Sequence, residues 1–323
     1  MNLADLWLAL LGFLLAGYFV LGGADYGVQM LAAAGNGRAR LLGGLGPFYF
    51  GNEVWLVGAL AVLIGAFPRL EGSLLPGFAP LFVPLVAALA LGKAGVQLRG
   101  RAAGGAGRRF WTVCVVAGGV IPATAFGMIF GLLLTGLPLR ADGGFDLGWA
   151  MVAGPFVLAC GLALTAVFAA HGLMFARLRV PGRAPARPGP VLAVAAVAVA
   201  GAALLGVGTA RPTQPGAAVA LAAAMVAVLG AAWWAARRGR AGWAFAATGV
   251  AAALPVVLLG AANHPYVLPG AGGTGMTVAE GAADEASLAV LSAFGLVVLP
   301  LVLAVQAWTW WRFRRPAEGP AYL

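Results

Sequence analysis

Long apolar segments alternate with short polar breaks along almost the whole chain. Because a helix needs roughly 20 apolar residues to cross the hydrocarbon core of a bilayer, we expect nine of these segments to be transmembrane helices. They cover residues 4–33, 46–67, 74–98, 110–136, 147–176, 189–209, 216–236, 242–261 and 287–311. The Ala-rich stretch 189–236 is divided in two because its segment TARPTQPG predicts a turn. The pattern therefore predicts an all-α polytopic membrane protein.

Composition supports this class. Hydrophobic residues make up 62% of the 323 residues and charged residues only 9%, which is too little charge to cover the surface of a soluble domain of this length. The net charge of +10 does not indicate nucleic-acid binding, because the basic residues fall in short clusters between apolar runs. The N-terminus lacks the basic region and cleavage site of a signal peptide, so we expect a retained first span.

The basic residues predict the orientation. Sixteen of the 20 Lys and Arg residues lie in alternate breaks and in the C-terminal tail, whereas seven of the ten acids lie on the opposite side. By the positive-inside rule, the N-terminus is outside and the C-terminus is cytoplasmic. The sixteen are Arg38, Arg40, Arg99, Arg101, Arg108, Arg109, Arg177, Arg179, Arg183, Arg187, Arg237, Arg238, Arg240, Arg312, Arg314 and Arg315.

Only four ionisable side chains fall inside the predicted spans: Asp25, Glu53, Lys93 and His171. The predicted topology places all four in the cytoplasmic half of the membrane. Such residues are expensive in a bilayer and mark candidate functional sites. No nucleotide-binding loop, zinc-protease motif or nucleophile elbow occurs in the sequence, so we expect no catalytic residue and no metal site on this chain.

Asp25 follows Gly23 and precedes Gly27, two glycines four residues apart that let another helix approach closely. Its carboxyl either carries protons or forms a structural ion pair, for which Lys93 is the obvious partner. Lys93 has a second interpretation, in which its long side chain reaches the inner interface.

Glu53 has Tyr49 four residues before it and Phe50 three residues before it, so a continuous helix would place both rings on the face of the carboxyl. A buried carboxyl that exchanges protons suits a proton relay. The alternative is a protonated acid that only bonds a neighbouring helix. Asn52 and Trp55 flank it.

The two histidines do not indicate a haem protein. His171 lies near a helix end and His264 in the predicted outer loop, where hydrogen-bonding or turn roles are common. Two histidines cannot supply the axial ligands of several haems. We therefore expect no cofactor on this chain.

Several segments resemble subunit II of the cytochrome bd-type quinol oxidases, in the order and spacing of that family. The most specific is Gly-Asn-Glu-Val-Trp at 51–55. The segments are GYFVLGGADYGVQML (17–31), GPFYFGNEVWLVG (46–58), LGKAGVQLRGR (91–101), GWAF (242–245), NHPYVLP (263–269) and LVLAVQAWTWWRF (301–313).

The resemblance implies a fold of two four-helix bundles plus a ninth helix, with bundles at 1–140 and 141–262 and the outer loop and ninth helix at 263–323. It implies a haem-free subunit of a bacterial inner-membrane enzyme that oxidises quinol and reduces oxygen to water, generating proton-motive force. Two b haems and haem d would lie on the partner, subunit I, and a small single-span subunit could also be present. Alternatives are a purely structural mate of the haem subunit, or a stand-alone proton-coupled transporter that uses Asp25 and Glu53.

The resemblance also assigns residues. It implies a proton pathway through Glu53 and Asp25, supported by Lys93, Asn52, Gly51 and Tyr26, and it places Trp55 near an oxygen path. Two family acids are missing: Phe50 stands where an acid commonly assigned to proton uptake is usual, and Gly22 where the first-span motif has a second acid. Lys93 stands where the family often has Arg. Either the relay runs through Glu53 and Asp25, or this chain has lost the route.

Overall fold

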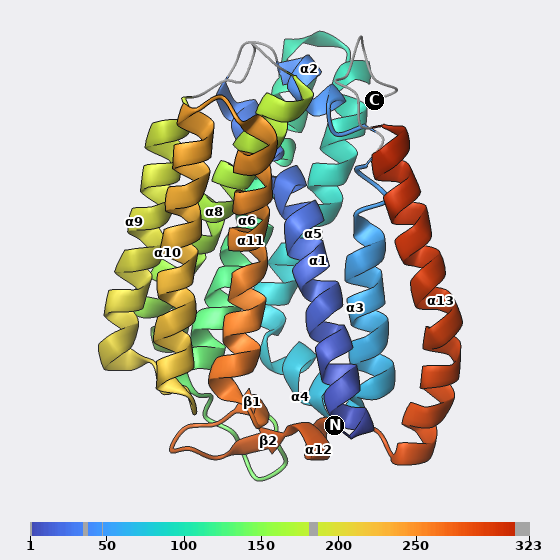
Figure 1. Ribbon diagram of the computed structural model, residues 1–323, viewed down its shortest axis with the longest axis vertical. Coiled ribbons are helices and arrows are strands. Elements are labelled where there is room, and N and C mark those ends of the chain that lie inside the picture. The colour runs from blue at the N-terminus through green and yellow to red at the C-terminus, as the bar shows by residue number, and fades with distance from the viewer. Residues whose placement is uncertain (1, 35–37, 47, 181–186, 314–323) are drawn as a thin grey trace.

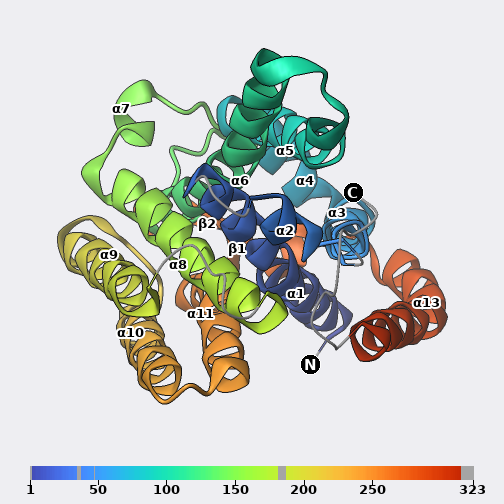
Figure 2. The same ribbon diagram turned by 90° about the horizontal axis from the view of Figure 1, so that it is seen from above.

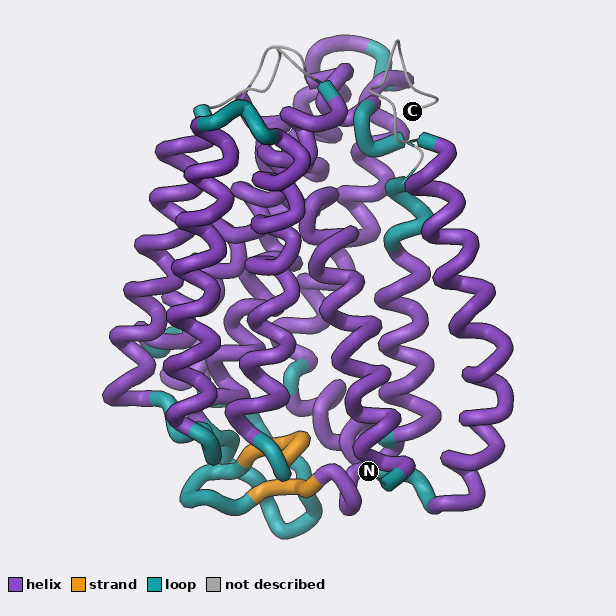
Figure 3. The backbone as a smooth tube through the Cα atoms, viewed as in Figure 1, coloured by secondary structure: helices purple, strands orange, loops and turns teal. Residues whose placement is uncertain are grey.

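The computed structural model describes residues 2–34, 38–46, 48–180 and 187–313, and these form long, roughly parallel helices with one small β-hairpin (Figures 1 and 3). Four residues used in the sequence argument lie outside the described residues: Arg183, Arg314, Arg315 and Pro47 of the 46–58 motif.

The long helices begin and end close to the predicted polar breaks, and proline stands in the first turn of α4, α5, α8, α9 and α10. In chain order the helices are α1 Leu3–Leu31, α2 Arg38–Gly43, α3 Glu53–Ala66, α4 Pro68–Gly77, α5 Ala79–Leu98, α6 Gly104–Thr135, α7 Trp149–Val152, α8 Pro155–Arg179, α9 Pro188–Thr209, α10 Pro215–Arg237, α11 Ala241–Asn263, α12 Val278–Gly281 and α13 Glu285–Arg312, with 3-10 turns at Ala32–Ala34 and Arg99–Arg101.

Eight of these helices are long and apolar enough to span a membrane, and a ninth results if α3 and α4 count as one span. The predicted second span, 46–67, is where the structure differs most. Helix α3 begins only at Glu53, after turns, and the chain bends by 118° between α3 and α4. The residues before Glu53 form turns because their side chains and carbonyls bind neighbouring helices instead of continuing a ladder, as the site below shows.

Glycine pairs set the helix packing around α1. A Cβ on Gly27 would lie 2.0 Å from the carbonyl oxygen of Phe168 and 2.8 Å from the Cα of Gly172, so the backbones of α1 and α8 touch. Gly92 of α5 meets Gly118 of α6 in the same way. In a bilayer, helices associate largely by van der Waals packing and by backbone approach at small residues. The close approach expected at Gly27 is therefore confirmed.

Helix α13 lies at the edge of the molecule, separated from most other helices (Figure 2). Leu288 is its only buried residue in the described structure. Polar contacts help to attach it: the indole nitrogen of Trp7 donates to Ser292 Oγ at 3.1 Å, and Gln306 Nε2 donates to Asn52 Oδ1 at 3.4 Å.

The loop 264–284 carries the hairpin β1 Tyr266–Pro269 and β2 Gly275–Thr277, which pair antiparallel with a bulge between Tyr266 and Leu268. This loop lies at the same end of the molecule as the N-terminus, opposite α2 and the C-terminal end of α13 (Figure 1). The segments at the α2 end include α2 itself, the turn after α5 and the α10–α11 turn (Figure 1), which carry Arg38, Arg40, Arg99, Arg101, Arg237, Arg238 and Arg240. The two ends thus carry the charge asymmetry used to predict the orientation.

Candidate proton-transfer site

Four segments that lie far apart in the sequence meet beside the second half of α1. Asp25 comes from α1, Asn52 from the turn before α3, Lys93 from α5 and Gln306 from α13. Asp25 is 2% exposed and Asn52 also 2%, so both polar side chains are withdrawn from the surface. A buried polar group is stable only when it is hydrogen-bonded. The contacts below supply those bonds.

Asn52 connects Asp25 to the last helix. Its Nδ2 donates to Asp25 Oδ2 at 3.0 Å and to the Leu21 carbonyl at 3.3 Å, while its Oδ1 accepts from Gln306 Nε2. An amide presents donors on one side and an acceptor on the other. Gln306 therefore favours the orientation in which Asn52 donates to the Asp25 carboxyl.

Glu53 pairs with Lys93 rather than standing alone. The Lys93 Nζ lies 2.7 Å from Glu53 Oε1, and the two side chains are 12% and 21% exposed. The same ammonium donates to the Tyr49 carbonyl at 2.9 Å and lies 3.6 Å from the centre of the Tyr49 ring. Lys93 thus has a carboxylate, a carbonyl and an aromatic face around it.

Two expectations about these residues are wrong. Lys93 forms its ion pair with Glu53 and not with Asp25, and its ammonium also donates to the Tyr49 carbonyl. Tyr49 and Phe50 do not share a helix face with Glu53, since the helix starts at Glu53. Tyr49 is buried under Lys93, whereas Phe50 is 54% exposed. Phe50, where the resemblance implies an acid, is therefore exposed and not part of this cluster.

Tyr26 and Gly51 lie near the cluster in different ways. The Tyr26 hydroxyl makes a short hydrogen bond with the hydroxyl of Tyr18, and both rings are almost wholly buried. Neither hydroxyl bonds Asp25 or Glu53 in the described structure. A Cβ on Gly51 would lie 3.5 Å from the Phe48 carbonyl oxygen and 3.9 Å from Gln306 Oε1, which are ordinary contact distances. Tyr18 and Gln306 are the polar neighbours that the sequence argument did not single out, although a glutamine in an apolar span was a visible signal.

Trp55 lies on the other face of α3, against α1. A Cβ on Gly17 would lie 2.1 Å from its ring, and the Phe13 ring centre lies 5.4 Å away. Its indole nitrogen is buried and has no hydrogen-bond partner among the described residues. Trp55 therefore fills the notch that Gly17 leaves in α1 and does not join the polar cluster.

Both ring nitrogens of His171 and its ring face are engaged in structural contacts. Its Nδ1 bonds Thr248 Oγ1 at 2.8 Å, its Nε2 lies 2.8 Å from the Val20 carbonyl, and the ring stacks on Phe245 at a centre distance of 4.8 Å. Because both ring nitrogens are engaged, neither is directed to a ligand. Within the described residues, no group of three or more His, Cys, Asp or Glu could hold a metal ion.

The arrangement combines two acids with one cation. Lys93 neutralises Glu53 directly, and Asp25 receives only a neutral amide, although it also interacts electrostatically with Lys93 and Glu53. A change in the charge of one carboxyl therefore changes the proton affinity of the other. The cluster therefore contains one buried and one partly buried carboxyl that interact electrostatically.

Comparisons with known proteins agree with one another. A family model described as "Cytochrome bd terminal oxidase subunit II" matches residues 3–313. The chain is 31% identical to the cytochrome bd ubiquinol oxidase subunit 2 of Bacillus subtilis over 97% of its length and 96% of that protein's. It is 25% identical to the cytochrome bd-I ubiquinol oxidase subunit 2 of Escherichia coli K12, covering 95% and 93% of the two chains.

The fold is similar to that of a solved bd oxidase chain from Geobacillus thermodenitrificans, with a TM-score of 0.71, 18% identity, and 97% and 99% of the two chains covered. The family match covers nearly the whole chain, including the turn and helix start that hold Asn52 and Glu53. This protein belongs to the cytochrome bd terminal oxidase subunit II family.

Proposed function

We propose that the chain is the haem-free subunit of a bd-type quinol oxidase, which pairs with the haem-bearing subunit I in the cell membrane. On this proposal the complex oxidises quinol and reduces oxygen to water, with two b haems and haem d on the partner. The cluster of Asp25, Asn52, Glu53 and Lys93 helps to deliver protons from the cytoplasm, with the N-terminus outside. The observation that carries this role is the buried acid Asp25 beside the partly buried pair of Glu53 and Lys93, where α1, α3 and α5 meet.

The same proposal covers the architecture. The helices up to residue 140 form one four-helix bundle, those from 141 to 262 a second, and α13 stands as the ninth helix. Nine spans follow if α3 and α4 cross the membrane as one broken span. Trp55 lies beside α1 in the first turn of α3, where an oxygen path is proposed, and the exposed outer face of α13 leaves room for a small single-span subunit.

The decisive experiment replaces Asp25 by asparagine in the assembled complex. The variant keeps the size of the side chain but cannot carry a proton, so we expect oxygen consumption to fall about ten-fold or more, the scale of a barrier raised by roughly 1.4 kcal/mol. The haem spectrum should be unchanged. Glu71→Gln, which removes an acid from α4 at the other end of the molecule, is the matched control and should leave turnover intact.

The second candidate is a purely structural subunit. It predicts that Asp25→Asn lowers the yield of complex or its haem content, whereas turnover per assembled complex stays at the wild-type value. That result would remove the proton role and leave the family assignment untouched. A stand-alone transporter would instead show proton-coupled transport by the isolated chain in liposomes.

A further inference from the structure

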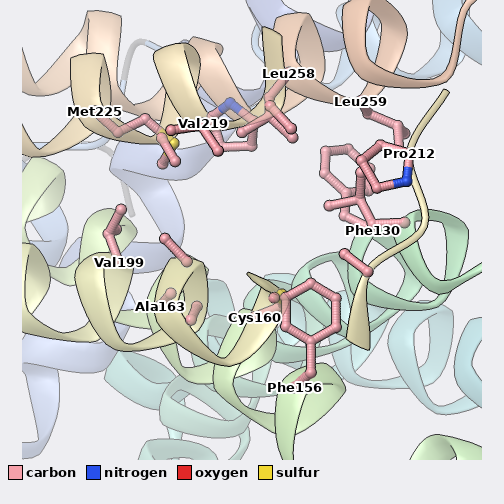
Figure 4. Close-up of a pocket in the computed structure, with 18 of the residues that line it drawn as sticks. Phe130, Phe156, Cys160, Ala163, Val199, Pro212, Val219, Met225, Leu258 and Leu259 are labelled. Atoms are coloured by element: carbon pink, nitrogen blue, oxygen red, sulfur yellow. The ribbon is translucent and has the colours of Figure 1, made fainter. Parts of the chain in front are cut away.

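An apolar cavity of about 300 Å³ lies between α8, α9, α10 and α11, with α6 closing one side (Figure 4). Among the described residues that line it, no side chain carries nitrogen or oxygen, and Cys160 and Met225 contribute sulfur. Water is retained in a cavity only where several polar partners bind it. The cavity is therefore suited to an apolar ligand, and its volume is at the lower end of the roughly 300–1,000 Å³ typical of ligand sites.

The cavity is long and narrow along the helices. The lining residues from Val199 to Ala210 recur every three or four positions, so they lie on one face of α9. The lining residues of α10, from Pro215 to Met225, follow the same pattern. Eleven residues of helix rise by roughly 16 Å, and half of the hydrocarbon core of a bilayer is about 15 Å. The cavity thus has the depth of one leaflet.

One end of the cavity is closed and the other is open. Beyond Val199 and Met225 the same helices pack against their neighbours through four side chains that are at most 1% exposed. Toward the α9–α10 turn, the lining residues Val207 and Val219 are 76% and 64% exposed. The tightly packed residues are Leu192, Ala195, Leu229 and Ala232. A chain-like ligand would therefore enter from the membrane surface at the α9–α10 turn.

Arg211 stands at that open end, between the lining residues Ala210 and Pro212. Its backbone N–H donates to the Leu134 carbonyl at 2.7 Å, which ties the turn to α6, and its guanidinium donates to the carbonyls of Gly208 and Ala210. In the described structure Arg211 makes no salt bridge, and the sequence contains no Asp or Glu from residue 147 to residue 279. The positive charge therefore lacks a counter-charge from its own part of the chain.

We propose that this cavity binds one acyl chain of an anionic phospholipid from the leaflet at the α9–α10 turn, with the lipid phosphate at Arg211. Helices in a bilayer are held together largely by van der Waals contacts, and an acyl chain restores the contacts that an empty cavity lacks. Guanidinium and phosphate form strong charge-assisted hydrogen bonds. A neutral isoprenoid chain would match the walls but would leave Arg211 without an anion.

The test uses the assembled complex in nanodiscs that contain phosphatidylglycerol with a photoreactive acyl chain. After illumination, peptides that carry the lipid are identified by mass spectrometry. We expect crosslinks on the lining residues of α9 and α10. Ala222→Phe fills the cavity with a ring and should abolish these crosslinks. Arg211→Gln should reduce them roughly ten-fold, the loss that a single strong polar contact gives, whereas Arg69→Gln, which removes another exposed arginine of the same end, should not.

Crosslinking that is equal in wild type and Ala222→Phe would overturn the site, because the label would then come from the outer surface of the helices. Equal crosslinking in wild type and Arg211→Gln, or equal occupancy by a photoreactive neutral isoprenoid chain, would overturn the anionic lipid as the occupant. Thermal stability of each variant complex shows whether it is folded. The crosslinks do not depend on oxygen turnover, so failure of the proton role leaves this test unaffected.

Discussion

The two halves of the molecule treat buried polar groups in opposite ways. Around α1, α3 and α5, the buried Asp25 is linked through the Asn52 amide to Gln306 of α13, and the partly buried pair of Glu53 and Lys93 lies beside it. In the region from α8 to α11 the sequence has no acid at all, and the buried histidine there has both ring nitrogens engaged. A polar group whose every partner is fixed serves packing, whereas carboxyls that interact electrostatically can change protonation.

The largest effect should come from breaking the ion pair of Glu53 and Lys93 in the polar half of the molecule, the region around α1, α3 and α5. Lys93→Met leaves the Glu53 carboxylate largely buried and without its cation, and loss of one partner of such a pair costs roughly 3–5 kcal/mol. We expect much less assembled complex and a lower melting temperature. The measurement is thermal unfolding of the complex, followed by haem absorbance and by size-exclusion chromatography.

The double variant Lys93→Met with Glu53→Gln distinguishes charge from packing. Since it removes both charges together, it should regain much of the stability that the single variant loses. If the double variant is as unstable as Lys93→Met alone, the pair does not act as an ion pair, and the difference between the two halves loses its main support.

In the other half, the region from α8 to α11, His171→Phe should have a smaller and purely structural effect. The variant keeps a ring to stack on Phe245 but leaves the Val20 carbonyl and the Thr248 hydroxyl without the imidazole. Because the Thr248 hydroxyl keeps its bonds to the Ala244 and Phe245 carbonyls, the loss is that of neutral hydrogen bonds worth about 0.5–1.5 kcal/mol each, and we expect a lower melting temperature. Oxygen turnover per haem should stay at the wild-type value.

The exposed histidine provides the control, because His264→Gln should change neither quantity. Loss of turnover in His171→Phe complexes that still carry their haems would contradict the structural role. It would also show that the second half takes part in the chemistry.

The contrast between the halves explains what the sequence could predict. Hydropathy and charge located the spans to within a few residues at most ends, because a bilayer imposes length and polarity on each helix independently of its neighbours. The polar residues Asp25, Asn52, Glu53 and Lys93 were also identifiable, since any ionisable residue in a span stands out. Their pairing was not, because it depends on how α1, α3 and α5 cross.

The start of α3 shows the limit most clearly. A helical reading of 46–67 put Tyr49 beside Glu53, but the tertiary contacts of Lys93 with the Tyr49 carbonyl and of Asn52 with Asp25 hold these residues in turns. Asn followed by Glu is a recognised helix-start signal and could have indicated the boundary. Asn52 makes no side-chain cap bond in the structure. Its amide is already used by Asp25 and Gln306.

A weaker effect should follow from Gln306→Leu, which removes the donor that orients the Asn52 amide. A neutral hydrogen bond contributes about 0.5–1.5 kcal/mol, so we expect turnover to fall by roughly two- to ten-fold, less than in Asp25→Asn. The pH at which turnover is half-maximal should shift, because Asp25 loses an ordered donor. The measurement is oxygen consumption against pH in the assembled complex.

Thr309→Val serves as the matched control on α13. It removes a hydroxyl whose recorded bond is to the Val305 carbonyl of its own helix, so it should leave the pH profile in place. An unshifted profile in Gln306→Leu would show that Asn52 holds its orientation without α13. The polar half would then be confined to α1, α3 and α5.

The smallest effect lies outside both halves, in the loop that leads into α13. Hydrogen bonds from the Thr277 backbone and hydroxyl lower the pKa of Glu280, and the Ser287 backbone N–H and hydroxyl lower the pKa of Asp284. A carboxyl with a lowered pKa stabilises the folded loop above its ordinary pKa, roughly 4, and this stabilisation is lost as the pH falls through the lowered value. Both groups are fully exposed, so solvent screens the effect and only local fraying is expected.

Hydrogen exchange, corrected for intrinsic rates, should show less protection in α12 and the first turn of α13 below pH of about 4, with the spans unchanged. Glu280→Gln should reproduce the loss in α12 at neutral pH, because it removes the charge that the capping box holds. Protection that is independent of pH would show that loop packing, and not these two carboxylates, orders the entry to the last helix.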